Sequence, residues 1–281
     1  MKVDAHQHFW HYDASEYAWI DDSMAALRRD FLPPHLKPLL DAAGFDACVA
    51  VQARQTVEET RWLLELAVEY PFIAGVVGWA DLRSAHVERD LEKFAGRRKL
   101  VGIRHIVQSE PDDFLRRPDF QRGIGVLDRF NLAYDILIYP RHLEAAAALV
   151  ARFPAQRFVL DHAAKPEIRR QAIAEWREGQ RRLSRFPNVC CKLSGLVTEA
   201  DWQTWTPEQI RPYIDVAADC FGAGRLMIGS DWPVSTVAAT YARTMAVVTD
   251  AIASWSADER AAVLGGTAMR FWNLRREDTL I

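Results

Sequence analysis

Short apolar runs alternate with amphipathic segments along almost the whole chain, and this alternation restricts the fold more than any other feature. Eight runs are apolar on both faces, as strands of a buried parallel sheet are. The segments between them carry apolar residues at helical spacing, as at Leu63, Leu64, Ala67 and Val68. Strands that alternate with helices in this way predict βαβ units and a parallel sheet.

The count of strands selects the architecture. Eight strands in 281 residues predict an α/β fold, a closed (β/α)8 TIM barrel. An open doubly wound sheet would carry a glycine-rich loop after the first strand, where this chain has His-Gln-His-Phe-Trp. The predicted strands are residues 1–10, 46–52, 72–79, 99–106, 132–138, 157–161, 188–193 and 225–229. The predicted helices are residues 38–44, 56–70, 82–94, 114–130, 142–153, 166–186, 207–221, 237–254 and 256–272.

Composition and organisation narrow the class of protein. Without a linker, repeat or low-complexity stretch, residues 1–281 are predicted to form a single domain, with a long aperiodic loop over 10–37. The net charge is −3 with both signs mixed, which argues against a nucleic-acid partner. No apolar run approaches about 18 residues and no secretory signal is visible, so we expect a cytoplasmic protein without a membrane span. Four cysteines lack metal-ligand spacing and are expected to be buried free thiols.

Polar residues gather at the carboxyl ends of the predicted strands, which is where such barrels place their active sites. His6 and His8 are two apart, so in a strand they share one face and could meet one ion or substrate group. Both could instead be ordinary polar residues on a frayed first strand. The other strand-end residues are Gln52, Arg54, Trp79, Asp81, Arg104, His105, Asp135, Tyr139, Asp161, His162, Lys192, Ser194, Ser230, Asp231 and Trp232.

Several strand-end residues have a structural alternative. Asp81 could be a helix N-cap, Asp161 the partner of an arginine, and Lys192 a snorkelling side chain. Ser194 could belong to a turn. For three histidines and one carboxylate the functional interpretation is favoured, because these side chains could converge on the barrel axis. They are His6, His8, His162 and Asp231.

The ordered motifs resemble those of the amidohydrolase superfamily, more narrowly its sugar-lactonase branch, related to L-fuconolactone and L-rhamnonolactone hydrolases. The matching motifs are His6-x-His8, Asp161-His162 and Gly229 to Pro233, supported by 51–53, 75–81, 102–105, 192–195 and 225–231. The resemblance implies a barrel whose strand-eight aspartate, Asp231, acts as general base on water and hydrolyses a cyclic ester. An aldonolactone such as L-fuconolactone is the implied substrate, within sugar metabolism and L-fucose catabolism.

The resemblance leaves open whether a metal ion is bound. Members with two metals bridge them with a lysine late on strand four, where this chain has Arg104. Many single-metal members take a histidine from strand five, where this chain shows Asp135 and Tyr139. One divalent cation such as Zn²⁺ and catalysis without metal therefore both remain open. The candidate metal ligands are His6, His8, His162 and Asp231.

Lactone opening needs a base, an oxyanion partner and a proton donor. Asp231 is the candidate base for water. The oxyanion could be stabilised by a Zn²⁺ ion, or by His162 and Arg104. His105, or the protonated base itself, could then protonate the leaving alkoxide.

Substrate recognition is expected from strand-end and loop residues. Gln52, Tyr139 and Lys192 are candidates for binding sugar hydroxyls, with Trp19 and Trp232 as apolar walls. A metal-dependent non-oxidative decarboxylase of an aromatic or related carboxylic acid is the alternative on the same barrel. A non-catalytic sugar-binding barrel is the third interpretation. The sequence leaves the oligomeric state open.

Overall fold

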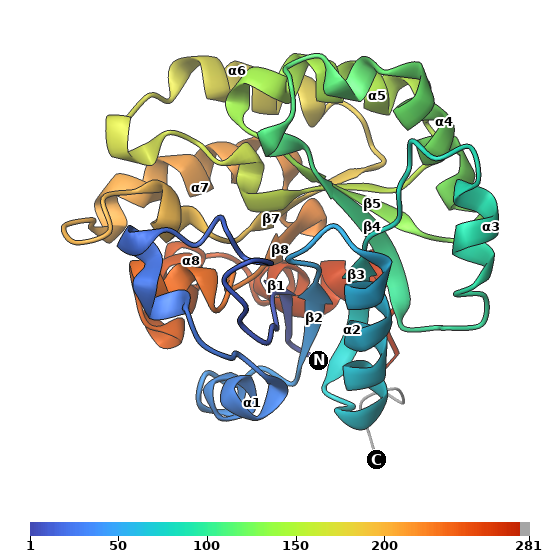
Figure 1. Cartoon of the computed structure of the whole chain (residues 1–281). Helices are drawn as coiled ribbons and strands as arrows, with labels where there is room; N and C mark the ends of the chain where they lie inside the picture. Colours follow the sequence, from blue (N-terminus) through green and yellow to red (C-terminus); the bar gives the residue numbers. More distant parts are fainter. Residues whose placement is uncertain (276–281) are drawn as a thin grey trace.

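Eight parallel strands surround a common axis in the computed structural model, which describes residues 1–275 (Figure 1). The strands pair in chain order from β1 to β8, so the predicted eight-stranded (β/α)8 barrel is confirmed. They are β1 Val3–Gln7, β2 Ala47–Val51, β3 Ile73–Gly78, β4 Leu100–Ile106, β5 Ala133–Leu137, β6 Phe158–Leu160, β7 Val189–Leu193 and β8 Leu226–Ile228.

Helices form an outer layer around the strands (Figure 1). The larger apolar core fills the space between the two layers. The α-helices are α1 Pro33–Ala42, α2 Val57–Glu69, α3 Val87–Glu92, α4 Pro118–Leu127, α5 Leu143–Arg152, α6 Ala174–Leu183, α7 Pro207–Phe221, α8 Tyr241–Ala251, α9 Ala257–Ala261 and α10 Thr267–Trp272. Within the described part of the chain, no helix combines the length and the apolar character that crossing a membrane requires.

The barrel interior is layered. Its apolar layer includes Ala133, Val159 and Cys190. Two residues further along β5, β6 and β7 come three fully buried charged side chains. They are Asp135, Asp161 and Lys192. Since residues two apart share a face of a strand, these charges form the next layer toward the carboxyl ends. The apolar layer and α10 close the opposite end, and the ring centroid of Trp272 in α10 lies 5.0 Å from the ammonium of Lys192 in the charged layer.

The joint between β8 and β1 differs from the other seven. Among the described strands it carries no ladder, only an isolated bridge between Gln7 and Trp232. Two backbone bonds cross it nearby: Asp231 N–H donates to the His6 carbonyl at 2.7 Å, and His8 N–H donates to the Trp232 carbonyl at 2.7 Å. We call this joint the β8–β1 seam.

The segment predicted as an aperiodic loop over 10–37 is partly ordered. Backbone bonds of 2.9 Å in both directions join Trp10 to Phe31, so the intervening residues form a loop with its ends held together. The loop contains a 3-10 helix, Asp22–Leu27. The following helix was predicted to start at residue 38, which is wrong: α1 starts at Pro33. Proline lacks only an N–H that the first helical turn leaves unpaired, so the proline pair starts the helix.

Several predicted helices are shorter than the apolar spacing indicated. The helix predicted over 166–186 begins as a 3-10 turn, Ile168–Arg170, which ends at Gln171 in the left-handed region. The regular helix α6 starts only at Ala174. The helix predicted over 256–272 is interrupted by a π-turn, Ala262–Gly266. Amphipathic spacing persists through such breaks because the chain keeps the same face toward the core.

Candidate active site

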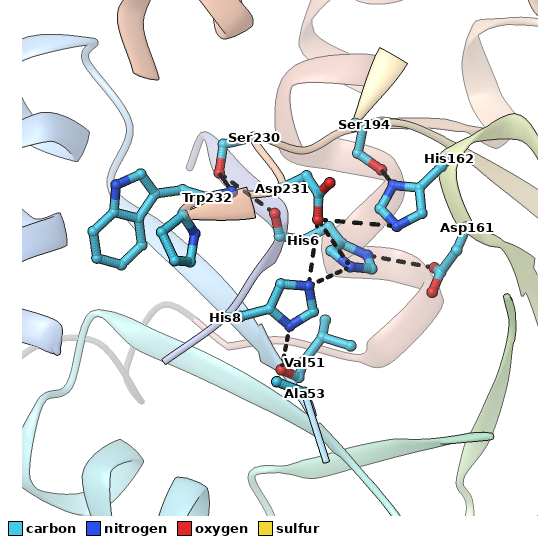
Figure 2. A network of polar contacts seen from close by, with 12 residues as sticks. His6, His8, Val51, Ala53, Asp161, His162, Ser194, Ser230, Asp231 and Trp232 are labelled. Atoms are coloured by element: carbon cyan, nitrogen blue, oxygen red, sulfur yellow. Dashed lines mark hydrogen bonds and ion pairs between the residues drawn. The ribbon is translucent and has the colours of Figure 1, made fainter. Parts of the chain in front are cut away.

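Three imidazoles surround the carboxylate of Asp231 at the carboxyl ends of β1, β6 and β8 (Figure 2). One oxygen, Asp231 Oδ1, lies 3.3 Å from His8 Nε2, 3.8 Å from His6 Nε2 and 4.0 Å from His162 Nε2. The two ring nitrogens His6 Nε2 and His8 Nε2 are 3.2 Å apart. All four residues are buried, with at most 5% of any of them exposed. The structure therefore brings together the four residues proposed as metal ligands.

The far nitrogens of two imidazoles are bound by neighbouring strand ends. His8 donates from Nδ1 to the Val51 carbonyl at 2.8 Å, which directs its Nε2 toward Asp231. His162 Nδ1 and Ser194 Oγ are hydrogen-bonded at 2.9 Å. These bonds fix the ring orientations that Figure 2 shows.

The backbone around the carboxylate adopts an unusual conformation. Asp231 has a φ of +55°, in the left-handed region that non-glycine residues rarely occupy. Gly195, also left-handed at φ +61°, lies against the cluster from the end of β7. A Cβ on Gly195 would stand 2.7 Å from His162 Nδ1 and 2.8 Å from Asp231 Oδ2. Only a glycine leaves room for both side chains.

A layer of paired charges lies beneath the imidazoles. Lys192 Nζ is 2.5 Å from Asp135 Oδ2, 2.9 Å from Asp161 Oδ1 and 3.2 Å from His6 Nδ1. Arg104 donates to Asp161 Oδ2 at 3.1 Å and to His6 Nε2 at 3.2 Å. Burial favours protonated carboxyls, but the charges of Lys192 and Arg104 and the hydrogen bond with His6 hold the pKa of Asp161 well below its usual range. Contacts with Lys192 and Arg104 therefore hold the imidazole of His6 in position.

Gln52 offers an unused hydrogen-bond donor in this site. Its side-chain oxygen accepts from Arg104 Nε at 3.2 Å and from Arg104 Nη2 at 2.9 Å, and its carbonyl also accepts from Nη2. Because the oxygen is assigned by these bonds, the other terminal atom is the amide nitrogen. That nitrogen is buried and has no hydrogen-bond partner among the described residues. A buried donor without a partner is costly, so it points to a group supplied by a ligand.

The protonation states suit a base and neutral ligands. Burial, followed by the charge of Lys192, lowers the pKa of His6 well below its usual range. Burial lowers the pKa of His162 to about 4. Burial would raise the pKa of Asp231, but its contacts with His162 and His8 outweigh this and hold the pKa below the usual range. At neutral pH His6 and His162 are therefore uncharged and Asp231 is ionised.

This donor set fits a zinc ion. Neighbouring ligands of a tetrahedral Zn²⁺ with bonds of about 2.0–2.1 Å are about 3.3 Å apart. Among His6, His8 and Asp231 the three ligand-atom separations are 3.2, 3.3 and 3.8 Å. One atom from each residue can thus face a single buried point. His162, with Nε2 4.0 Å from the same carboxylate oxygen, stands at the edge of this group.

The structure places His105 away from the cluster. Adjacent residues of a strand point to opposite faces, and in β4 it is Arg104 that points into the barrel. His105 Nε2 instead pairs with Glu110 Oε1 at 2.9 Å, and its ring stacks on Phe114 with centroids 4.9 Å apart. The proposed role of His105 as proton donor to the leaving alkoxide therefore has no geometric support.

Two predicted substrate contacts also lie elsewhere. The indole of Trp232 points away from the imidazoles (Figure 2) and packs on Phe31 and Phe9, with centroids 5.2 and 6.2 Å apart. It is a core residue rather than a wall of the site. Lys192 is fully buried in the charged layer beneath His6, so it positions other residues instead of meeting sugar hydroxyls.

Two other candidates stand at the rim. Trp19 is 43% exposed on the loop after β1, with its ring 6.0 Å from that of Trp10. Tyr139 follows β5 and is partly exposed between two cations, Arg141 and Lys165, 5.0 and 5.6 Å from its ring centroid. Both remain accessible to a ligand.

Sequence reasoning assigned no role to Asp4, which organises the seam. Asp4 Oδ1 accepts from Ser230 N–H at 2.8 Å and from His6 N–H at 3.2 Å, and Oδ2 accepts from the Tyr241 hydroxyl at 3.1 Å. Burial raises its pKa to about 6. The sequence feature that could have indicated this role is a charged residue in the apolar first strand, two positions before His6.

Comparisons with known proteins agree with these features. The family model described as Amidohydrolase matches residues 3–274. An L-fucono-1,5-lactonase of Burkholderia multivorans (strain ATCC 17616 / 249) is 44% identical over 286 residues, 98% of this chain and 96% of the relative. An L-fucono-1,5-lactonase of Burkholderia ambifaria is 40% identical over 283 residues, 98% of this chain and 97% of the relative.

A solved structure is similar along the whole barrel. It is the crystal structure of an amidohydrolase from Burkholderia multivorans with bound zinc. The TM-score is 0.95 at 44% sequence identity, covering 98% of this chain and all of that chain. A zinc ion is therefore present in the structure of a close homologue.

Proposed function

Because the chain belongs to the amidohydrolase family, we propose that it is a lactonase that opens a sugar lactone, such as L-fucono-1,5-lactone, to the free acid. One observation carries this proposal: an ionised carboxylate, Asp231, faces three imidazole nitrogens within 3.3–4.0 Å in one buried site. Two L-fucono-1,5-lactonases at 44% and 40% identity support the substrate class.

Asp231 acts as the general base in this proposal. Its carboxylate is ionised at neutral pH and takes a proton from a water molecule, and the resulting hydroxide adds to the lactone carbonyl carbon. His6 and His8 hold the carboxylate and the water in place. The left-handed backbone at Asp231 aims its side chain at this point.

The developing oxyanion needs donors that are already in position. The unpaired amide nitrogen of Gln52 provides one, beside the guanidinium of Arg104 that fixes it. His162 is a further candidate. When the ring C–O bond breaks, the protonated Asp231 returns its proton to the leaving alkoxide, which closes the cycle without His105.

A metal would add one element to this chemistry. His6, His8 and Asp231 would hold a zinc ion, which as a Lewis acid would polarise the carbonyl group. The role of His162 would then be to contact the substrate rather than to complete the ligand set.

The experiment measures lactone hydrolysis with a pH indicator, using L-fuconolactone and the purified protein. Asp231→Asn should lower kcat by about 10³-fold, within the range that general bases contribute. Asp90→Asn, at an exposed surface ion pair, is the matched control. Unchanged hydrolysis by Asp231→Asn, with circular dichroism showing a folded protein, would refute the role of this base.

A chelation arm separates the proposal from the decarboxylase alternative. The protein is dialysed against a chelator, analysed for zinc, and assayed both for lactone opening and for CO₂ release from 2,6-dihydroxybenzoate. We expect lactone opening and no CO₂ release with metal present. Metal-dependent CO₂ release without lactone opening would favour the decarboxylase.

A further inference from the structure

An ion pair that the catalytic chemistry does not use stands at the rim of the barrel. Lys165 Nζ lies 3.1 Å from Glu199 Oε1, and their side chains are 19% and 17% exposed. Lys165 follows β6, and Glu199 ends the 3-10 helix Leu196–Glu199 that follows β7. The ring of Tyr139, after β5, is centred 5.6 Å from the same ammonium. Three consecutive strand ends thus contribute to one cluster, the rim cluster.

The backbone that carries Lys165 is strained. Four consecutive residues, His162 to Lys165, have φ values of 51°, 48°, 60° and 49°, all left-handed. The left-handed conformation is sterically unfavourable for residues with a Cβ, so other contacts must hold the turn. Trp176 and Gln180 do so by donating to the Ala163 carbonyl at 2.7 and 2.8 Å. Strain that the surroundings maintain is typical of residues placed for function.

The rim cluster is connected directly to the catalytic residues. Lys165 N–H donates to the His162 carbonyl at 2.8 Å, so one tight turn carries both side chains. Glu199 lies four residues after Gly195, which contacts His162 and Asp231. The ammonium that pairs with Glu199 and the imidazole of His162 are therefore carried by the same short segment.

A cavity of about 1220 Å³ opens on the outer side of the cluster. Tyr139, Lys165 and Glu199 form part of its wall, together with residues of the loops around α5 and α6. The rim cluster therefore lies in the wall of this cavity, and the backbone of Lys165 joins it to His162. A ring held at Asp231 could extend its substituents toward the cluster.

We infer that Lys165, Glu199 and Tyr139 bind the hydroxyl groups of a neutral polyhydroxylated lactone. This inference rests on the proposed lactonase function. Glu199 accepts from sugar hydroxyls, Lys165 donates to them, and the ring of Tyr139 packs on a C–H face. The ion pair carries no net charge, so the cluster favours neutral sugars over lactones with carboxylate groups. A lactone without hydroxyls gains nothing from the cluster.

The test compares two substrates, L-galactono-1,4-lactone, which carries hydroxyls, and δ-valerolactone, which carries none. For each protein the ratio of kcat/KM for the two lactones is measured. Glu199→Gln and Lys165→Met should each lower this ratio at least tenfold, mainly through KM for the hydroxylated lactone. Glu58→Gln, at an exposed ion pair with Arg61, is the control and should leave the ratio within twofold.

The outcomes separate the inference from the proposed function. An unchanged ratio in both variants, while the wild type opens both lactones, overturns the inference and leaves the lactonase function standing. A wild type that opens neither of these lactones nor L-fuconolactone overturns both. Glu199→Gln preserves the size of the side chain. Should it nevertheless unfold, as judged by thermal denaturation, Lys165→Met alone decides the result.

Discussion

The β4–β5 joint and the β8–β1 seam close the same barrel by different means. Between β4 and β5, five consecutive residue pairs run from Gly102 and Ala133 to Ile106 and Leu137. At the β8–β1 seam, one bridge with two backbone bonds takes the place of a ladder, and the carboxylate of Asp4 accepts from the backbone on both sides. One joint is held by a ladder of backbone bonds, and the other by a few backbone bonds together with a side chain.

The difference explains where the carboxylate of Asp231 lies. A residue inside a ladder keeps an extended backbone, because its N–H and carbonyl groups are already paired. Asp231 lies beyond the end of β8 and outside any ladder; its N–H donates to the His6 carbonyl, and it adopts the left-handed conformation that turns its side chain toward His6 and His8. The position of Asp231 then depends on Asp4 and Ser230, which hold the neighbouring backbone.

Removing Asp4 should break the seam and give the largest effect on stability. Asp4→Ala leaves Ser230 N–H, His6 N–H and the Tyr241 hydroxyl without their acceptor in a fully buried place. At about 1–3 kcal/mol for each buried unpaired group, we expect a loss of about 4 kcal/mol, measured by urea denaturation. The kcat for lactone opening should fall as well, because the Asp231 backbone loses its support.

A matched change among β2 to β5, which are joined by ladders and which we call the ladder half, tests whether this sensitivity belongs to the seam. Thr60 Oγ1 donates to the Trp79 carbonyl at 3.0 Å and accepts from Trp79 N–H at 2.8 Å, at the end of β3. Thr60→Val removes the partner of two backbone groups and should cost about 2 kcal/mol, and it should leave kcat within threefold because β3 has a ladder on both sides. If Thr60→Val lowers kcat as much as Asp4→Ala does, the contrast between the joints is lost.

Alanine substitutions at two glycines compare the surroundings of Asp231 with the β4–β5 ladder by their effects on activity. Gly195→Ala places a methyl group against His162 and Asp231, and its φ of +61° adds strain. We expect kcat/KM to fall about 100-fold, about 2.7 kcal/mol of transition-state stabilisation. Gly102→Ala, in the β4–β5 ladder, meets Ala133 O at 3.2 Å and should lower stability while keeping activity within threefold. Equal losses of activity in both variants would contradict this view.

The same contrast separates what the sequence predicted from what it did not. The strands were predictable because an apolar run buried on both faces is a local property. The rule that barrel sites lie at the carboxyl ends of strands then indicated His6, His8 and Asp231. The role of Asp4 was not predictable, since its partner Ser230 is 226 residues away in the chain.

At β4, the local sequence pattern also did not predict which side chain points into the barrel. Arg104 and His105 are neighbours, and only the register of the barrel decides which of them points inward. The prediction gave both residues a catalytic role, whereas only Arg104 contacts the cluster. The rim cluster was also missed as a unit, because the left-handed turn that aims Lys165 has no signal in the residues of 162–165.

In the ladder half, the carboxylate of Glu59 also accepts from two backbone N–H groups. Replacing it should have a smaller effect on stability than replacing Asp4. Glu59 Oε2 accepts from Ala53 N–H at 3.0 Å and from Arg54 N–H at 2.7 Å, after the end of β2. Burial raises the pKa of Glu59 to about 7 from its ordinary 4.5. Between these two values the folded protein holds a proton that the unfolded chain has lost.

The sign of the resulting pH dependence follows from that proton. The stabilisation is fully present below pH 4.5 and is lost as the pH rises through 7, the folded-state pKa of Glu59. Glu59→Gln does not titrate, so the wild type should lose about 2 kcal/mol relative to this variant between about pH 5 and pH 8. Urea denaturation of both proteins across this range measures the difference. A constant difference would mean that Glu59 is ionised throughout, and that its backbone bonds outweigh burial in the ladder half.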